Sequence, residues 1–225
     1  MIWTFRLFGN FMQLKIILSA VEKELFDAWK TFCEDLPNVE IYHGSILDLS
    51  VDAVVSPANS YGFMDGGIDL LYSHRLGWHV QERLQKLIRE KHHGELLIGQ
   101  AEIVETDNGQ IPFVISAPTM RVPMILKDSV NPYLAARAVF LLIKHGMFFN
   151  GNYKDEPINK FVQSVAFSGL ATGVGKIGFN TCAKQMQKAI EDFVLEKSSF
   201  PQSWVDASAK HQELYTDRIR NLQYD

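Results

Sequence analysis

Two glycine-rich loops, residues 57–67 and 169–178, each follow a short apolar run and each lead into a segment with helical spacing. The run before the first loop is Val51–Ser56 (VDAVVS), and the run before the second is Phe161–Ser168. The apolar, β-branched run Val51–Ser56 is typical of a strand buried on both faces of a sheet, and Phe161–Ser168 is expected to be another strand. In an open α/β sheet, ligands bind beyond the carboxyl ends of the strands. The pattern therefore predicts an α/β fold in which both loops could hold one ligand.

The rest of the chain alternates between the same two kinds of pattern. Strands are expected at Leu14–Leu18, Val39–Tyr42, Gln100–Glu105 and Phe113–Ala117, and helices at Val21–Glu34, around Val80–Ile88, from Asn131 through Leu142 and around Ala183–Phe193. Asn131 is expected to cap its helix, with Pro132 at the first helical position. Asp107–Gln110 has the composition of a hairpin turn. This alternation predicts an α/β sandwich with a largely parallel or mixed sheet.

Composition excludes several classes of protein. The 225 residues include 22 Lys and Arg and 26 Asp and Glu, so the formal net charge is −4. Such a chain is a poor candidate for non-specific nucleic-acid binding, which depends on basic surface. Two cysteines, Cys33 and Cys182, are too few for a disulfide framework or a thiolate zinc site, and Cys182 is expected to be a small buried residue. The seven histidines lack metal-ligand spacing, so we expect no metal and no cofactor.

The first 20 residues, MIWTFRLFGNFMQLKIILSA, are apolar enough to be mistaken for a signal peptide. Polar residues interrupt the run, no clear cleavage site follows it, and no apolar stretch of the chain reaches the ~18 residues needed to cross a bilayer. We therefore expect a cytoplasmic protein without a membrane partner, in which a short leader precedes the first strand.

The second loop contains Gly173-Val-Gly175-Lys-Ile-Gly178, a literal G-x-G-x-x-G between a strand and a helix. Alone, this motif would indicate a dinucleotide-binding fold, but only one helix and a polar tail follow it, so that topology is rejected. Glycine still lets backbone N–H groups approach phosphate oxygens, and a helix N-terminus favours anions. The loop therefore indicates a phosphate-bearing ligand, with a glycine-rich turn that binds nothing as the alternative.

The first loop carries polar side chains as well as glycines. Asn59 can both donate and accept hydrogen bonds, as a sugar hydroxyl requires. Gly66 and Gly67 permit close approach of a ligand to the backbone. Asp69 is expected in the first turn of the next helix, where it is either a catalytic carboxylate or only a favourable partner of the helix dipole.

Taken together, VDAVVSPANSYGFMDGGID and the later GLATGVGKIG resemble the macro domain family, whose members typically carry a VDAIVNAAN-type strand and loop, a GGG-V-D segment and a late S-T-G loop. The resemblance covers about residues 38–195, and it is especially close to a bacterial subgroup with SPANS-x-GFMDGGID and APTMR-x-P segments. It implies a three-layer α/β/α sandwich with a mixed, mostly parallel central sheet. It also implies one domain over residues 1–197, with an N-terminal strand–helix extension before the core, and a C-terminal tail at 198–225.

The resemblance also implies that the chain binds ADP-ribose and which residues do so. Asn59 would contact the distal ribose and is expected to be catalytic together with Asp69, which matches an aspartate that supports catalysis in many hydrolases of the family. The implied ligand-binding set is Ser45, Ile46, Ala58, Asn59, Gly66, Gly67, Ile68, Thr172, Gly173, Val174, Gly175 and Lys176. Residues 66–68 would line the diphosphate and distal ribose, and residues 172–175 would form the second phosphate-binding loop.

Three positions depart from the family pattern. Ser45 stands where the family usually has an aspartate that recognises the adenine amino group, so adenine selectivity is open. Ser73 stands where a histidine is frequent. Gly175 replaces an aromatic residue that flanks the distal ribose, which implies a more open pocket.

Two functions of different class fit these residues. The first is hydrolysis of ADP-ribosylated substrates or ADP-ribose derivatives, in which Asp69 stabilises an oxocarbenium-like transition state or positions a water. The second is a non-catalytic ADP-ribose reader. A third, an assembly protein that keeps the fold, is favoured only by the aromatic-bearing tail. The expected partner is ADP-ribose or an ADP-ribosylated substrate, with nucleic acid only as a modified substrate; carrier, linkage and oligomeric state stay open.

Overall fold

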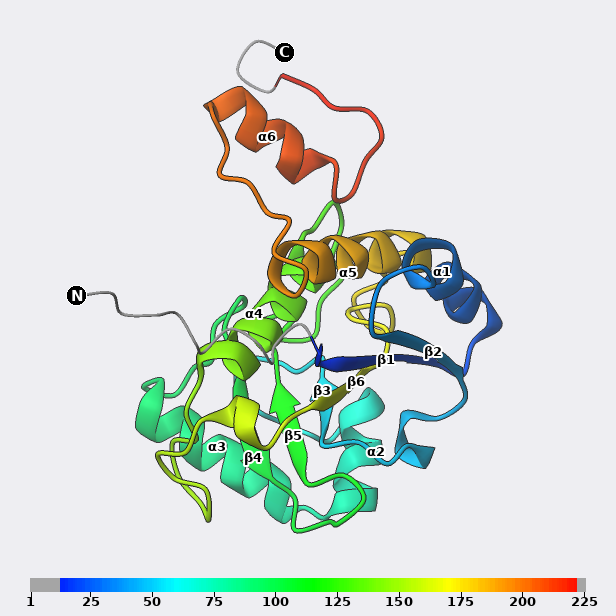
Figure 1. Cartoon of the computed structure of the whole chain (residues 1–225). Coiled ribbons are helices and arrows are strands. Elements are labelled where there is room, and N and C mark those ends of the chain that lie inside the picture. The colour runs from blue at the N-terminus through cyan, green and yellow to red at the C-terminus, as the bar shows by residue number, and fades with distance from the viewer. Residues whose placement is uncertain (1–12, 222–225) are drawn as a thin grey trace, which may run out of the picture.

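The computed structural model of the chain describes residues 13–221. These residues form one six-stranded sheet in the order β2-β1-β6-β3-β5-β4 (Figure 1). The strands are β1 (Lys15–Ala20), β2 (Val39–His43), β3 (Ala53–Ser56), β4 (Glu102–Glu105), β5 (Phe113–Ser116) and β6 (Ser164–Phe167). All neighbouring strands run parallel except β4 and β5, which are antiparallel. The predicted mixed, mostly parallel sheet is confirmed.

Helices cover both faces of this sheet (Figure 1). They are α1 (Lys23–Cys33), α2 (Gly67–Leu76), α3 (His79–Lys91), α4 (Asn131–His145), α5 (Phe179–Phe193) and α6 (Trp204–Gln212), with short 3-10 turns η2 (Ile46–Asp48) and η3 (Ile158–Lys160). Ile16 and Leu18 of β1 pack into the core beneath α1, α4 and α5, whereas Ile17 between them packs beneath α2 and α3. This alternation follows from the two-residue period of a strand. The predicted three-layer α/β/α sandwich is confirmed.

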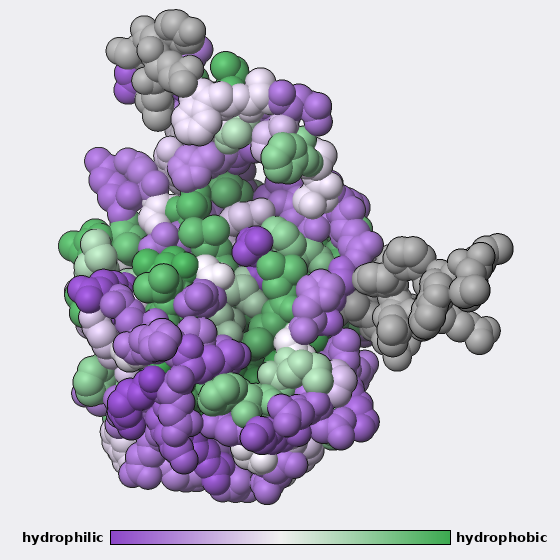
Figure 2. Space-filling view, turned by 90° about the vertical axis from the view of Figure 1, so that its left-hand side faces the viewer, coloured by the Kyte–Doolittle hydropathy of each residue, from purple (hydrophilic) through white to green (hydrophobic). Residues whose placement is uncertain are grey.

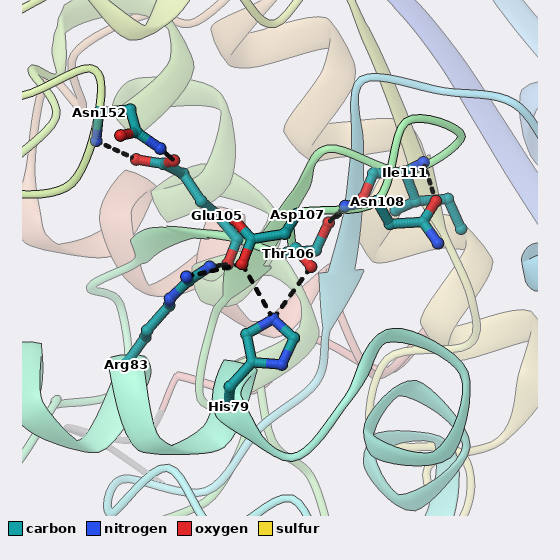
Figure 3. A network of polar contacts seen from close by, with 8 residues as sticks. All are labelled: His79, Arg83, Glu105, Thr106, Asp107, Asn108, Ile111 and Asn152. Carbon is teal, nitrogen blue, oxygen red and sulfur yellow. Dashed lines mark hydrogen bonds and ion pairs between the residues drawn. The ribbon is translucent and has the colours of Figure 1, made fainter.

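Polar contacts with α3 and a later loop fix the end of the edge strand β4 (Figure 3). Arg83 donates to the carbonyl oxygen of Glu105 at 2.9 Å and to the carboxylate of Asp107 at 2.7 Å. The Glu105 carboxylate accepts two hydrogen bonds of 2.6 Å from Asn152. The antiparallel pairing of β4 with β5 confirms the hairpin predicted around residues 107–110. This network lies at the amino ends of the parallel strands, so it stabilises the sheet away from their carboxyl ends.

The start of α4 differs from the prediction. The Asn131 side chain does not cap the helix: its Nδ2 donates to the carbonyl oxygen of Thr119 at 2.8 Å. Val130 precedes the helix and supplies no side-chain cap, although Pro132 lies in the first turn as predicted. Cys182 is fully buried in the first turn of α5, as expected, and burial raises the pKa of its thiol to about 12.

The C-terminal tail contains a helix that the sequence did not predict. Helix α6 stands beyond the layer of α4 and α5 (Figure 1), and Gln185 of α5 holds the tail by donating to the carbonyl oxygen of Leu214 at 3.2 Å. In the space-filling view, the tail with α6 lies at the top, above a face whose middle carries many apolar residues (Figure 2). No helix within residues 13–221 is long and apolar enough to cross a membrane. The predicted leader lies largely within residues 1–12, outside the described residues.

Candidate functional site

A cavity of about 440 Å³ lies at the carboxyl ends of the parallel strands. Its walls come from the ends of β1, β3 and β6, from η2, from the start of α2 and from the two glycine-rich loops. Its volume falls within the range of small-molecule sites, which is about 300–1,000 Å³. The cavity therefore occupies the edge of the sheet at which a ligand is expected in an open α/β fold.

Ten of the thirteen predicted site residues line this cavity. They are Ser45, Ile46, Ala58, Asn59, Gly66, Gly67, Ile68, Asp69, Gly173 and Val174. Thr172, Gly175 and Lys176 do not line it. A Cβ atom at Gly175 would lie 2.5 Å from the carbonyl oxygen of Ala171, so glycine at this position is required by the turn itself.

Three glycines leave the backbone open to the cavity. A Cβ atom built at Gly66, Gly67 or Gly173 would meet no atom within 4 Å. Gly67 also has φ +56°, a conformation that favours glycine. Gly66 precedes α2, and no side chain of the described residues caps that helix. The first N–H groups of α2 are therefore available to an anionic ligand in the cavity.

Asp69 is a buried carboxylate on the wall of the cavity. The residue is 7% exposed and lies in the first turn of α2, as predicted. Ser56 at the end of β3 donates its hydroxyl to Asp69 Oδ1 at 2.5 Å. Burial raises the pKa of Asp69 to about 6; the Ser56 hydrogen bond lowers it, and the nearby Asp65 raises it. A carboxyl group with this pKa can exchange a proton near neutral pH.

The Asn59 carboxamide lines the cavity, but its hydrogen bonds shape its own loop. Its Nδ2 donates to the carbonyl oxygen of Phe63 at 2.8 Å. Its Oδ1 accepts from the N–H groups of Tyr61 at 3.1 Å and Phe63 at 3.3 Å. One Nδ2 hydrogen is left for a ligand. Asn59 therefore fixes the first loop whatever else it contacts.

The two serines that depart from the family pattern also make local hydrogen bonds. Ser45 lines the cavity, and its hydroxyl accepts from the N–H group of Leu47 at 3.3 Å at the start of η2. Ser73 of α2 is buried, and its hydroxyl donates to the carbonyl oxygen of Met64 at 2.7 Å. Ser73 does not line the cavity, so its hydroxyl serves the packing of α2.

The cavity includes residues that the sequence did not point to. They include Ser19, Ala20, Val21, Glu22 and Leu25 at the end of β1 and the start of α1, Thr119, Met120 and Pro123 after β5, and Ser168 after β6. The APTMR-x-P segment could have indicated the second group. The first group depends on β1 lying next to β6, which the sequence does not reveal.

The charges around the cavity are acidic. Glu22, Asp65 and Asp69 line it, whereas no Lys, Arg or His of the described residues does. Within residues 13–221, no group of three or more His, Cys, Asp or Glu side chains could hold a metal ion. Among the described residues, the donors open to an anionic ligand are therefore neutral ones, namely backbone N–H groups, hydroxyls and the Asn59 carboxamide.

The sequence profile of one family, the Macro domain, matches residues 55–186, which run from β3 into α5. This match covers more than half of the chain, and the chain belongs to the macro domain family. An uncharacterized protein of Aquifex aeolicus (strain VF5) is 30% identical over 158 residues, which cover 69% of this chain and 82% of that protein.

Solved macrodomains share the fold. A mutant of the Oceanobacillus iheyensis macrodomain, solved with ADPR, has a TM-score of 0.55 at 17% identity and covers 81% of this chain and 91% of its own. The macrodomain of Mycobacterium tuberculosis DarG has a TM-score of 0.53 at 19% identity and covers 67% of this chain and 88% of its own. At these identities the likeness concerns the fold alone.

Proposed function

We propose that this chain binds ADP-ribose in the cavity and hydrolyses the bond that joins ADP-ribose to a carrier. One observation carries this proposal: two glycine-rich loops and a buried carboxylate, Asp69, line one cavity at the carboxyl ends of the strands. The Oceanobacillus iheyensis macrodomain mutant of the same fold was solved with ADPR, and this supports the choice of ligand. Membership of the macro domain family supports it as well.

Binding of the diphosphate depends on the open backbone of the two loops. The N–H groups at the start of α2 lie beside Gly66 and Gly67, and Gly173 presents an open backbone from the second loop. The partial positive charge of a helix N-terminus favours phosphate at this place. Because no basic side chain of the described residues lines the cavity, these neutral donors supply the attraction.

Hydrolysis breaks the bond between the anomeric carbon of the distal ribose and the carrier, and a water oxygen takes the place of the carrier. Positive charge develops on the sugar ring in the transition state. An ionised Asp69 stabilises this charge or accepts the proton of the attacking water. Since the pKa of Asp69 is about 6, the ionised form predominates above that pH.

The alternative is a reader that binds ADP-ribose without turnover. Two observations favour it: the Asn59 carboxamide is already bonded within its own loop, and the Ser73 hydroxyl points to the carbonyl oxygen of Met64 instead of the cavity. Asp69 would then be a single titratable group without a catalytic partner. Turnover distinguishes the two functions.

Calorimetric titration with ADP-ribose, with AMP as the control, tests binding. We expect ADP-ribose to bind at least tenfold more tightly than AMP, because AMP lacks the groups that reach the second loop and Asp69. Release of ADP-ribose from an ADP-ribosylated protein then tests hydrolysis, with Asp69→Asn as the inactive control. Binding without release would select the reader. Absence of binding would refute both functions.

A further inference from the structure

Four serines lie side by side at the carboxyl ends of neighbouring strands. Ser56 of β3 pairs with Ser116 of β5. Leu18 of β1 pairs with Phe167 of β6, so the next residues, Ser19 and Ser168, lie side by side. Val54 of β3 pairs with Ala166 of β6, so two residues further along Ser56 lies beside Ser168. We call Ser19, Ser168, Ser56 and Ser116 the serine row. The serine row runs across the sheet at the carboxyl ends of the strands, next to the cavity.

The hydroxyls of the serine row have different partners. Ser19 donates to the carbonyl oxygen of Gly44 at 2.8 Å. Ser116 and Ser168 have buried hydroxyls without a hydrogen-bond partner in the described part of the chain. Ser56 alone donates to a titratable group, the carboxylate of Asp69, at 2.5 Å. The short distance is typical of a charge-assisted hydrogen bond between a hydroxyl and a carboxylate.

This contact fixes the direction of the Asp69 carboxylate. Ser56 is fully buried on a central strand, so its hydroxyl stays in place and cannot follow a movement of the Asp69 carboxylate. It holds Oδ1, whereas Oδ2 has no hydrogen bond to any residue of the described range, and Asp69 lines the cavity. The atom that can meet a substrate is therefore Oδ2.

The other charged and titratable groups near Asp69 do not stabilise its ionised form. Asp65 and Glu22 line the same cavity and carry like charges. Tyr72 of α2 donates its hydroxyl to the carbonyl oxygen of Val55 at 3.1 Å and is not bonded to Asp69. The N-terminus of α2 and the Ser56 hydroxyl are the groups that favour the carboxylate.

We propose that Ser56 is the positioning residue of Asp69, which holds Oδ1 so that an ionised Oδ2 faces the substrate. The inference rests on the proposed hydrolysis. Ser56 acts through Asp69 and does not touch the substrate, because it does not line the cavity. Loss of its hydroxyl removes the hydrogen bond to the charged form while leaving burial unchanged.

The test compares Ser56→Ala with Ser116→Ala. Ser116 is the matched control, because it is a buried serine at the adjacent position of the row and its hydroxyl has no partner within residues 13–221. The pH dependence of kcat for release of ADP-ribose from an ADP-ribosylated protein is measured for both variants and the parent. In Ser56→Ala we expect the acid limb to move up by about one pH unit, with kcat at pH 6 about fivefold lower and KM unchanged. The pH dependence of kcat in Ser116→Ala should match that of the parent.

A second measurement does not depend on turnover. Carboxyl carbon NMR, with the Asp69 signal identified by its loss in Asp69→Asn, follows the titration of Asp69 in each variant. A higher midpoint in Ser56→Ala alone supports the inference, and an unchanged midpoint or an unchanged acid limb overturns it. A parent that binds ADP-ribose but releases none refutes the proposed hydrolysis, and with it a positioning role in that reaction, whatever the midpoint.

Discussion

Replacing Asp69 by Asn should stabilise the protein at alkaline pH and change its stability little at acid pH. The folded protein holds the pKa of Asp69 at about 6, against 3.8 for an unperturbed aspartate. The folded state therefore binds the proton more tightly than the unfolded state does. Stability from this preference is fully present below pH 3.8 and is lost as the pH rises through 6.

The magnitude follows from that difference of about two pKa units, each of which corresponds to ~1.4 kcal/mol. Asp69 is only 7% exposed, so solvent screening reduces the value little. Asparagine is neutral at every pH, has nearly the same shape and keeps an Oδ1 that accepts from Ser56. When the pH rises from 4 to 8, the free energy of unfolding of Asp69→Asn should therefore increase by about 2–3 kcal/mol relative to that of the parent.

Urea unfolding at pH 4, 6 and 8 measures this gain, and equal m-values show that both proteins unfold in the same way. Asp65→Asn is the matched control, because Asp65 lies beside the same helix start but is exposed. A gap between Asp69→Asn and the parent that is constant from pH 4 to pH 8 would refute the reasoning. So would a gap of the same size in the control.

Three further predictions concern the loops and the charge of the cavity. Gly173→Glu should abolish ADP-ribose binding in calorimetry yet keep the parent's urea midpoint, since a Cβ there meets no atom within 4 Å. Gly175→Ala should instead lower the free energy of unfolding by about 1–3 kcal/mol, because its Cβ would lie 2.5 Å from the Ala171 carbonyl oxygen; an unchanged urea midpoint would contradict this. The affinity for ADP-ribose should not fall when NaCl is raised from 50 to 500 mM, because no basic side chain of residues 13–221 lines the cavity, and a steep loss of affinity with salt would contradict it.

The sequence predicts those features that depend on neighbouring residues. Strand and helix periodicity predicts an α/β sandwich, and the glycine-rich loops predict the edge at which the cavity lies. Asp69 is found because its place after Gly66 and Gly67 puts it in the first turn of α2. A local pattern is sufficient here, because backbone conformation and a helix start are decided over a few residues.

Local patterns are less informative where a side chain has several partners within reach. Asn59 reads as a ligand contact, yet its carboxamide is bonded to Tyr61 and Phe63 of its own loop. Gly175 reads as part of a phosphate-binding motif, whereas the folded loop needs it to pass the Ala171 carbonyl oxygen. The choice among partners depends on the path of the loop, which the motif does not specify.

By itself, the sequence determined the α/β class, the two loops and the position of Asp69, because each of these follows from local periodicity or a short motif. Only the tertiary structure decided that β1 lies between β2 and β6, which brings Glu22 to the cavity. It alone decided that Ser56 and Asp69, thirteen residues apart, meet at 2.5 Å. Strand order and buried hydrogen bonds result from packing between distant segments, and no local pattern contains that information.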